Sequence, residues 1–338
     1  METTSNTLHN GTDSSQSAAN TAKAIAVDNG ALPAITAVMK IYKDSAKLQS
    51  RAILIFAALA QDNADHQDAI ADCHGVSYIL AAMLAHSKSS SLCLEACSAL
   101  DKCTSLCPRS ASQLAHGDGV RTLRDTMQLH SKHASIQQYA LQVLVHVSRQ
   151  PPPPTNLLNQ NHTHDPYVCL HFVEDPELME LLVELLIKHR KVKPILQLGG
   201  TLIHILAKHG KPRTKSSLVW SKAVPVLLKV SKSFSSNALT QLDALQALLA
   251  LSIERPEARE VVAEDGSAIV FDAMSCHARN LAIQHTATQL IHLVCQGHTS
   301  IFIAKCLKKH SKYVQVLQNT PDTFPIQCTT MIDQILAC

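Results

Sequence analysis

The chain has 338 residues, of which 46% are hydrophobic and only 4% aromatic, and its formal net charge is +3. This length exceeds one ordinary core, and the apolar residues are mostly Ala, Leu, Ile and Val, which favours stacked helices over a sheet sandwich. The longest apolar run, residues 52–60, is far too short to span a membrane as a helix.

Charge is distributed unevenly along the chain. Residues 1–185 hold 12 Lys/Arg and 18 Asp/Glu, a balance of −6, whereas residues 186–338 hold 18 and 9, a balance of +9. The eleven Cys are an odd number, and no apolar signal segment follows Met1. These features predict free thiols in a reducing compartment, the cytoplasm or alternatively the nucleus.

The first 20 residues are rich in Ser, Thr, Asn and Gln without apolar periodicity, which predicts a disordered tail. From residue 21 to 148 a first block of repeats follows. The junctions Gly30, Gly75 and Gly119 are 45 and 44 residues apart. Each unit reads as a short, a medium and a longer helix, and each junction Gly is expected to supply positive φ where one helix ends.

Residues 149–175 interrupt this spacing and predict a loop insertion. Four prolines, Pro151 to Pro154, favour an extended left-handed helix that serves either as a stiff spacer or as a ligand for a partner. Four potential metal ligands also occur here, and a polar loop is favoured over a zinc site because no second element orders them. These ligands are His162, His164, Cys169 and His171.

A second, basic block of repeats spans residues 176–338. Gly199 and Gly200 interrupt its first long helix, which predicts a close approach of a neighbouring helix or a kink. A further junction occurs at Asp265-Gly266, and residues 299–338 form a last, weaker unit. The total is about seven repeats.

The three-helix unit of 44–45 residues resembles the armadillo repeat. The resemblance rests on the junctions at residues 72–76, 117–120 and 263–266 and on long-helix cores such as residues 96–100 and 244–248. It implies a right-handed all-α solenoid, with HEAT repeats as the near alternative, and a protein partner bound as an extended segment along the third helices. It implies no cofactor.

In armadillo proteins an Asn ladder and, in importin alpha, Trp residues grip the partner, and this chain departs from both. Where Asn is expected it has Ala58, Lys102, His146, His204, Ala250 and His292. Where Trp is expected it has Leu54, Ser98, Gln142, Gly200, Gln246 and Thr288. We therefore expect no nuclear-signal recognition, and we expect a groove that binds through Lys102, His146, His204, His292, Ser98, Gln142 and Gln246. The alternative for the three His is that they are half-buried residues packed between helices, without a role in binding.

Four cysteines form two pairs, Cys93 with Cys97 and Cys103 with Cys107, each spaced by one helical turn rather than as zinc ligands, so we expect small buried side chains and no metal.

A run of basic residues is the clearest functional feature of the sequence. Residues 185–242 contain no acid and eleven Lys/Arg, of which the predicted patch comprises Lys188, Arg190, Lys191, Lys193, Lys208, Lys211, Arg213 and Lys215. Cations at helix C-termini account for part of this run.

Taken together, the sequence predicts a non-enzymatic intracellular scaffold or adaptor that binds an extended or acidic protein segment, because no phosphate loop, nucleophile elbow or paired-carboxylate spacing occurs. One alternative is a binder of anionic polymers or lipids through the basic patch, although nucleic acid is disfavoured by the scarcity of aromatic residues. Another alternative is the structural end of a larger scaffold.

Overall fold

The computed structural model describes residues 7–149, 173–295 and 315. Within these residues the regular elements are helices and no strand is present, so the predicted all-α solenoid is confirmed. The four-proline segment, the His/Cys cluster at residues 162–171 and all but one residue of the last predicted unit lie outside the described residues.

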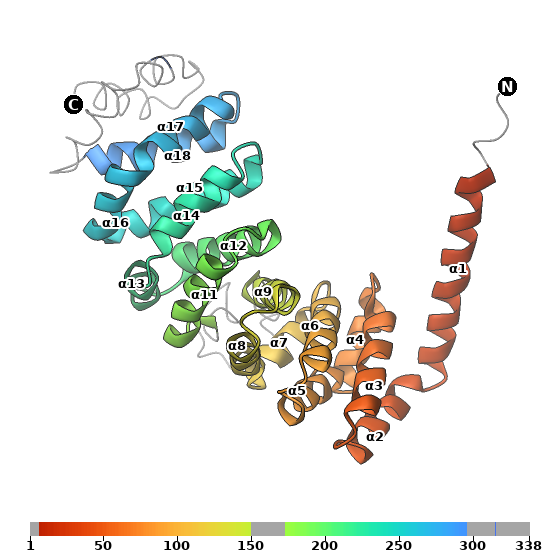
Figure 1. Cartoon of the computed structure of the whole chain (residues 1–338). Coiled ribbons are helices and arrows are strands. Elements are labelled where there is room, and N and C mark those ends of the chain that lie inside the picture. Colours follow the sequence, from red (N-terminus) through yellow and green to blue (C-terminus); the bar gives the residue numbers. More distant parts are fainter. Residues whose placement is uncertain (1–6, 150–172, 296–314, 316–338) are drawn as a thin grey trace, which may run out of the picture. The chain divides into compact units, whose positions relative to one another are not determined.

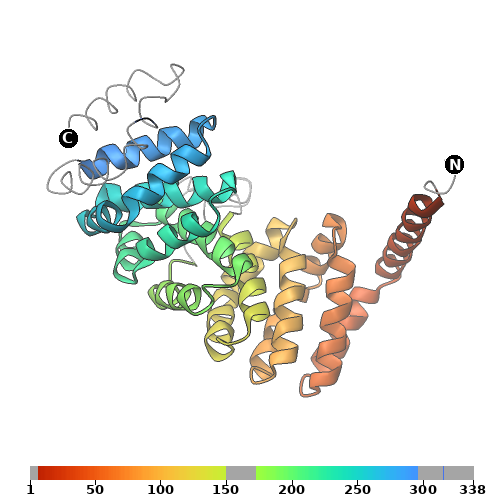
Figure 2. The same ribbon diagram turned by 45° about the horizontal axis from the view of Figure 1, so that its top comes forward.

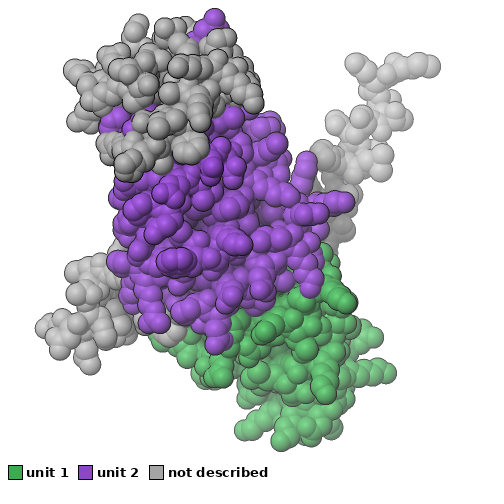
Figure 3. All heavy atoms as spheres, turned by 60° about the vertical axis from the view of Figure 1, so that its left-hand side comes forward, with its two compact units in different colours: residues 1–159 green, residues 160–338 purple. Residues whose placement is uncertain are grey.

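The chain forms two compact units, residues 1–159 and 160–338 (Figure 3). The helices of unit 1 are α1 (Thr7–Asp28), α2 (Ala31–Ile41), α3 (Ala46–Ala60), α4 (Ala64–Asp72), α5 (Gly75–Ala85), α6 (Ser90–Thr104), α7 (Pro108–His116), α8 (Gly119–Leu129) and α9 (Ala134–Arg149). Those described in unit 2 are α11 (Pro176–Lys188), α12 (Lys193–His209), α13 (Pro212–Trp220), α14 (Ala223–Ser233), α15 (Ala238–Glu254), α16 (Pro256–Val261), the π-helix η2 (Val262–Gly266), α17 (Ser267–Cys276) and α18 (Leu281–Cys295).

Within each unit the elements stack as the repeat predicts. The most extensive contacts join successive third helices, α3 to α6 to α9 in unit 1 and α12 to α15 to α18 in unit 2 (Figure 1, Figure 2). The second helices α2, α5 and α8, and likewise α11, α14 and α17, each pack on the third helix of their own repeat. Aliphatic side chains fill the space between them, as in stacked repeats generally.

The N-terminal segment differs from the prediction, because α1 occupies Thr7–Asp28 where a disordered tail was expected over residues 1–20. No proline interrupts residues 7–28, and Ala is frequent from residue 18 onward, so helix propensity prevails although apolar periodicity is weak. No single helix among the described residues is long and apolar enough to cross a bilayer; the consecutive helical segments Ala18–Asp28 and Ala31–Ile41, bent by 66°, pass that test only as a pair.

The junction glycines serve close packing more than positive φ. Gly30 has a φ of +81°, as predicted, but at the next two junctions the left-handed residues are His74 and Asp118. A Cβ on Gly75 would lie 2.5 Å from the Ile70 side chain, and a Cβ on Gly119 would make a similar clash with the residue five positions earlier. The glycine at these junctions therefore lets the second helix start directly against the first.

The glycine pair in α12 produces close helix packing without a break in the helix. A Cβ on Gly199 would lie 2.2 Å from Cδ2 of Leu186 in α11, and a Cβ on Gly200 would lie 3.1 Å from Cγ1 of Val230 in α14. α12 runs uninterrupted through both positions. Of the two predicted explanations, close approach is confirmed on both sides of the helix.

A buried glutamine closes the turn before four of the third helices, at the fourth residue of each helix. Gln137 Nε2 donates to the carbonyl oxygens of Met127 at 3.0 Å and His130 at 3.1 Å at the end of α8, of which that of His130 also accepts from His133 N–H. The same residue type stands at the same place in the other three helices and donates to the end of the preceding helix; these residues are Gln49, Gln241 and Gln284. Cys93 replaces it in α6 and Leu196 in α12.

A histidine at the end of the second helix links each of three turns to the turn of the preceding repeat. His86 Nε2 bonds the carbonyl oxygen of Lys43 at 2.9 Å, and His130 Nε2 bonds that of Ser87 at 2.7 Å, both in unit 1. In unit 2 His277 Nε2 bonds the carbonyl oxygen of Ser235 at 2.7 Å. Because each link spans 42 or 43 residues, it holds neighbouring repeats at one register.

Candidate functional site

Each unit presents an open face made by its third helices. Residues on this face recur at three- and four-residue intervals and are half-buried or exposed, whereas the residues between them are fully buried. On α3 the open face is apolar, with Leu54 and Ile55 exposed. On α6 and α9 it is polar, so within unit 1 the chemistry of the face changes from one repeat to the next.

The structure places all seven predicted groove residues on these open faces, half-buried. Unit 1 contributes Lys102 and Ser98 from α6 and Gln142 and His146 from α9. Unit 2 contributes His204, Gln246 and His292.

The predicted equivalence of the rows is off by one residue in α12 and α18. Gly200 and Thr288, which stand in the predicted Trp row, are buried, and the open-face residues next to them are Thr201 and Gln289. Counted from the first residue of each helix, His146 is the thirteenth residue of α9, whereas His204 and His292 are the twelfth residues of α12 and α18. The three histidines therefore do not share one position, because the long-helix core alone does not fix the start of the helix.

A polar cluster joins α6 and α9. His146 Nδ1 lies 3.6 Å from Asp101 Oδ1 and 3.2 Å from Thr104 Oγ1. Burial raises the pKa of Asp101 to about 6, an effect that the neighbouring Lys102 partly offsets. Burial, followed by the positive charge of Arg149, lowers the pKa of His146. At neutral pH the cluster is thus a carboxylate beside a neutral imidazole.

Two oxygen atoms on this face are buried without a hydrogen-bond partner within the protein. They are Oδ1 of Asp101 and Oε1 of Gln142. A buried acceptor without a donor costs about 1–3 kcal/mol. Both atoms are covered by the protein itself, so this cost is part of the stability of the folded chain.

The open face of unit 2 has a hydrogen bond between neighbouring third helices. Thr201 Oγ1 donates to Asp243 Oδ2 at 3.0 Å across α12 and α15. Exposed Lys208 continues the open stripe of α12, four residues after His204. This face therefore offers a cation at its C-terminal end and a paired polar centre.

The predicted basic patch divides into two clusters. Lys188, Arg190, Lys191 and Lys193 lie at the turn between α11 and α12, whereas Lys208, Lys211, Arg213 and Lys215 lie beyond or at the other end of α12. Lys193 and Lys208 are 15 residues apart on one helix, which corresponds to about 22 Å. The eight residues of the predicted patch are therefore close in sequence but do not share one face of the structure.

Two lysines of the second cluster are paired with acidic residues that lie elsewhere in the sequence. Lys215 Nζ lies 2.6 Å from Glu254 Oε1, and Lys211 Nζ lies 3.6 Å from Glu174 Oε2. Both acids lie outside the acid-free run of residues 185–242. The expectation of a run without counter-charge is therefore wrong for these two lysines, while Lys208 and Arg213 are exposed.

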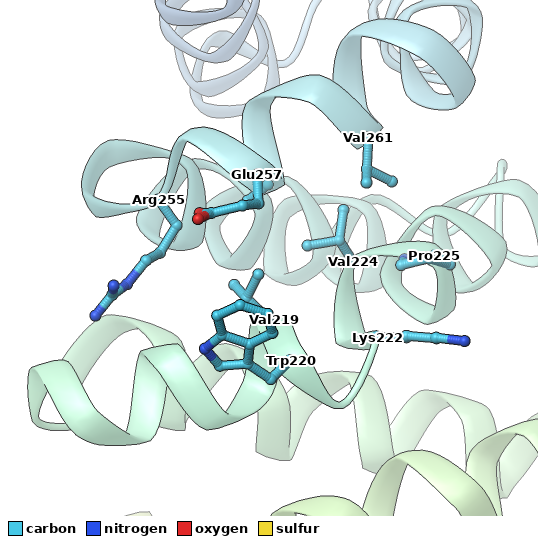
Figure 4. A pocket seen from close by; sticks show the side chains of 9 residues that line it. Val219, Trp220, Lys222, Val224, Pro225, Arg255, Glu257 and Val261 are labelled. Carbon is cyan, nitrogen blue, oxygen red and sulfur yellow. The ribbon is translucent and has the colours of Figure 1, made fainter.

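A pocket that was not predicted lies between α13, α14 and α16. Its volume is 160 Å³, and Figure 4 shows the indole of Trp220 beside Val219 and facing Glu257. Trp220 is 76% exposed, which is unusual for the one Trp of the chain. In the sequence, the only sign of this pocket is the single Trp, because the α16 residues that line the pocket follow some 35 positions later.

Among the described residues, no group of three or more His, Cys, Asp or Glu is arranged to hold a metal ion. The four helix-spaced cysteines are free and buried. Burial raises the pKa of Cys93 to about 11 and that of Cys103 to about 12, so these thiols stay protonated at neutral pH.

No family model matches the chain, and no curated protein is found as its relative. Solved structures do resemble it. One engineered protein is 19% identical at a TM-score of 0.58 over 77% of this chain and 96% of that one, and another is 17% identical at 0.58 over 94% and 80%. A structure from work on a phosphorylation switch between cadherin and beta-catenin is 10% identical at a TM-score of 0.44, over 94% and 79%. At these identities the first two likenesses concern the fold alone, and the third carries no argument.

Proposed function

We propose that the chain is a non-enzymatic, intracellular binding protein of armadillo type that holds an extended protein segment across its third helices. The observation that supports this most directly is the row of half-buried polar side chains on the open face of unit 1, Ser98 and Lys102 on α6 and Gln142 and His146 on α9. An extended segment carries backbone N–H and C=O groups at regular intervals, and these groups pair with polar side chains without requiring a specific side chain of the segment.

The partner is proposed to be acidic at one end. Lys102 follows Asp101 on the open face of α6 in unit 1, and Lys208 ends the open stripe of α12 in unit 2. Cations at the edge of a contact raise the association rate and make binding sensitive to salt. The compartment is proposed to be the cytoplasm, or the nucleus, because the buried free thiols suit a reducing environment.

The test is a selection of displayed random peptides on the full chain, followed by affinity measurements with two matched variants. Gln142→Ala removes an open-face acceptor, and Gln128→Ala removes the same side chain from the exposed surface of α8. We expect selected peptides to lose about tenfold in affinity with Gln142→Ala, corresponding to about 1.4 kcal/mol, and to be unaffected by Gln128→Ala. A selection without binders, or binders insensitive to Gln142, would remove the proposal.

A further inference from the structure

In each unit, the turns between the second and third helices form a second surface, which we call the turn edge of that unit. It comprises residues 42–45, 86–89 and 130–133 in unit 1 and residues 189–192, 234–237 and 277–280 in unit 2. The third residue of four of these turns is an exposed cation, and these cations are Lys88, Lys132, Lys191 and Arg279. Each unit therefore has two of these cations on its turn edge, on neighbouring turns in unit 1 and on the first and third turns in unit 2.

The histidine links fix the positions of these turns. In unit 1 the bonds of His86 and His130 join all three turns into one row, and in unit 2 the bond of His277 joins two. Neighbouring helices pack about 8–10 Å apart, so successive turns along a unit lie at about that spacing. Because the turns that carry these cations are already held in place, little conformational entropy is lost when they bind a partner.

Charge is sorted strongly toward the turn edge. Each turn with three flanking residues on either side makes a ten-residue window: 39–48, 83–92, 127–136, 186–195, 231–240 and 274–283. These windows hold eleven Lys/Arg, five in unit 1 and six in unit 2, and one acid, Asp44. All eleven cations are exposed. The whole chain has 30 Lys/Arg and 27 Asp/Glu, so this edge is far more positive than the composition requires.

Aliphatic side chains stand exposed among these cations. Within the windows of unit 1 these include Ile41, Leu84 and Leu129, which are 70%, 58% and 55% exposed. In unit 2 they are Ile187, Leu239 and Leu281. A row of cations alone would suit any polyanion, but cations together with an exposed aliphatic residue in each window are the composition of a surface that enters the boundary between lipid headgroups and acyl chains.

We propose that the turn edge binds the surface of an anionic lipid bilayer. The cations would meet headgroup phosphates and carboxylates, and the exposed aliphatic side chains would enter the layer below them. Nucleic acid is the less suitable partner, because the windows contain aliphatic residues in place of the aromatic platforms on which bases stack. This surface is separate from the open face of the third helices, so a segment can be held there at the same time.

The experiment uses the full chain and sedimentation with vesicles of phosphatidylcholine alone or with about a third phosphatidylserine, at low salt. The edge variant is Lys191→Glu with Lys193→Glu, and the control is Lys208→Glu with Arg213→Glu, which makes the same change in charge at the other end of α12. Each lost cation near a charged bilayer lowers affinity about fivefold, so the edge variant should lose at least about 25-fold and the control much less.

A second variant separates lipid from other anions. Leu84→Ser with Leu129→Ser should weaken vesicle binding about tenfold and leave its dependence on salt unchanged, because no charge is removed. Circular dichroism melts should confirm that all variants fold, since every substituted side chain is exposed.

Three results would overturn the proposal: equal binding to neutral and anionic vesicles, equal losses in the edge variant and its control, or no vesicle binding. Retention of single-stranded RNA or polyglutamate by the chain, unaffected by loss of the two leucines and without vesicle binding, would assign the edge to nucleic acid or to an acidic protein. A peptide selection that succeeds while vesicle binding fails would leave the function of the open face intact.

Discussion

At the residue scale, the cluster of Asp101, Thr104 and His146 shows how one substitution on an open face changes the energetics of its neighbours. Asp101 has a side chain that is only 16% exposed, and its Oδ1 has no hydrogen-bond donor. Its charge is therefore poorly solvated in the folded chain. A carboxylate kept in such a place disfavours the fold whenever it is ionised.

We expect Asp101→Asn to stabilise the chain at alkaline and neutral pH and not in acid. The folded-state pKa of about 6 lies above the ordinary value, so the wild type gains stability as pH falls through 6 toward 4 and loses it as pH rises. The amide has no such dependence. The gain should be about 1–3 kcal/mol above pH 7 and vanish near pH 4.

Thermal melts of both proteins across this pH range measure the difference. Ser98→Ala, on the same face of α6, is the control and should show no pH-dependent difference from the wild type. A constant offset between Asp101→Asn and the wild type at all pH values would contradict the assignment of the raised pKa to Asp101.

At the element scale, the helices and their order follow from the sequence because the 44–45-residue period repeats the same boundary signals. Pro176, Pro212 and Pro256 begin helices in the structure, as proline does at first helical positions. The glutamine at the fourth residue of four third helices was not predicted. Its spacing was visible in the sequence, but its meaning depends on where the helix before it ends.

We expect Gln137→Leu to destabilise unit 1 by about 1–3 kcal/mol, because the carbonyl oxygen of Met127 loses its side-chain donor and that of His130 keeps only the bond from His133 N–H. Leucine preserves most of the volume, so little of the effect comes from a cavity. Urea denaturation measures the loss.

The matched control is Gln138→Leu, the neighbouring half-exposed residue of α9, which should change stability by less than about 0.5 kcal/mol. Repeat four carries Leu196 at the corresponding place. Tolerance of Gln137→Leu equal to that of the control would mean that the hydrogen bonds to Met127 and His130 contribute no net stability.

At the scale of each unit, the sequence predicts the order and packing of the helices better than it predicts which residues share a surface. The predicted basic patch was one segment in the sequence, yet a 17-residue helix separates its halves and Glu174 and Glu254 neutralise two of its members. Conversely, Lys88 and Lys132 are far from Lys191 in sequence but share its place in the repeat. Only knowledge of where each turn lies sorts the charges into edges, and the predicted rows are off by one residue in α12 and α18 because the starts of these helices were not known.

We expect His130→Ala to weaken the coupling between the second and third repeats of unit 1. The substitution removes a bond to the turn at Ser87 and should cost about 1 kcal/mol. In a stacked-repeat protein, weaker contact between neighbours also lowers cooperativity, so the urea dependence of unfolding should become shallower.

Native-state hydrogen exchange should then show α8 and α9 opening without α5 and α6. His133→Ala, an exposed histidine of the same turn, serves as the control and should leave the slope unchanged. Identical slopes for His130→Ala and His133→Ala would show that the link does not couple the repeats.

The form of these links bears on how such a chain is able to evolve. The donor is a side chain that belongs to the repeat itself, in the three repeats that have the link, but the acceptor is a main-chain oxygen, offered here by a lysine in one case and by serines in the others. Any residue supplies that oxygen. A repeat copied by gene duplication would therefore find its acceptor on whichever repeat precedes it, with no compensating mutation in that neighbour. The number of repeats can change between descendants while the register of the stack is kept.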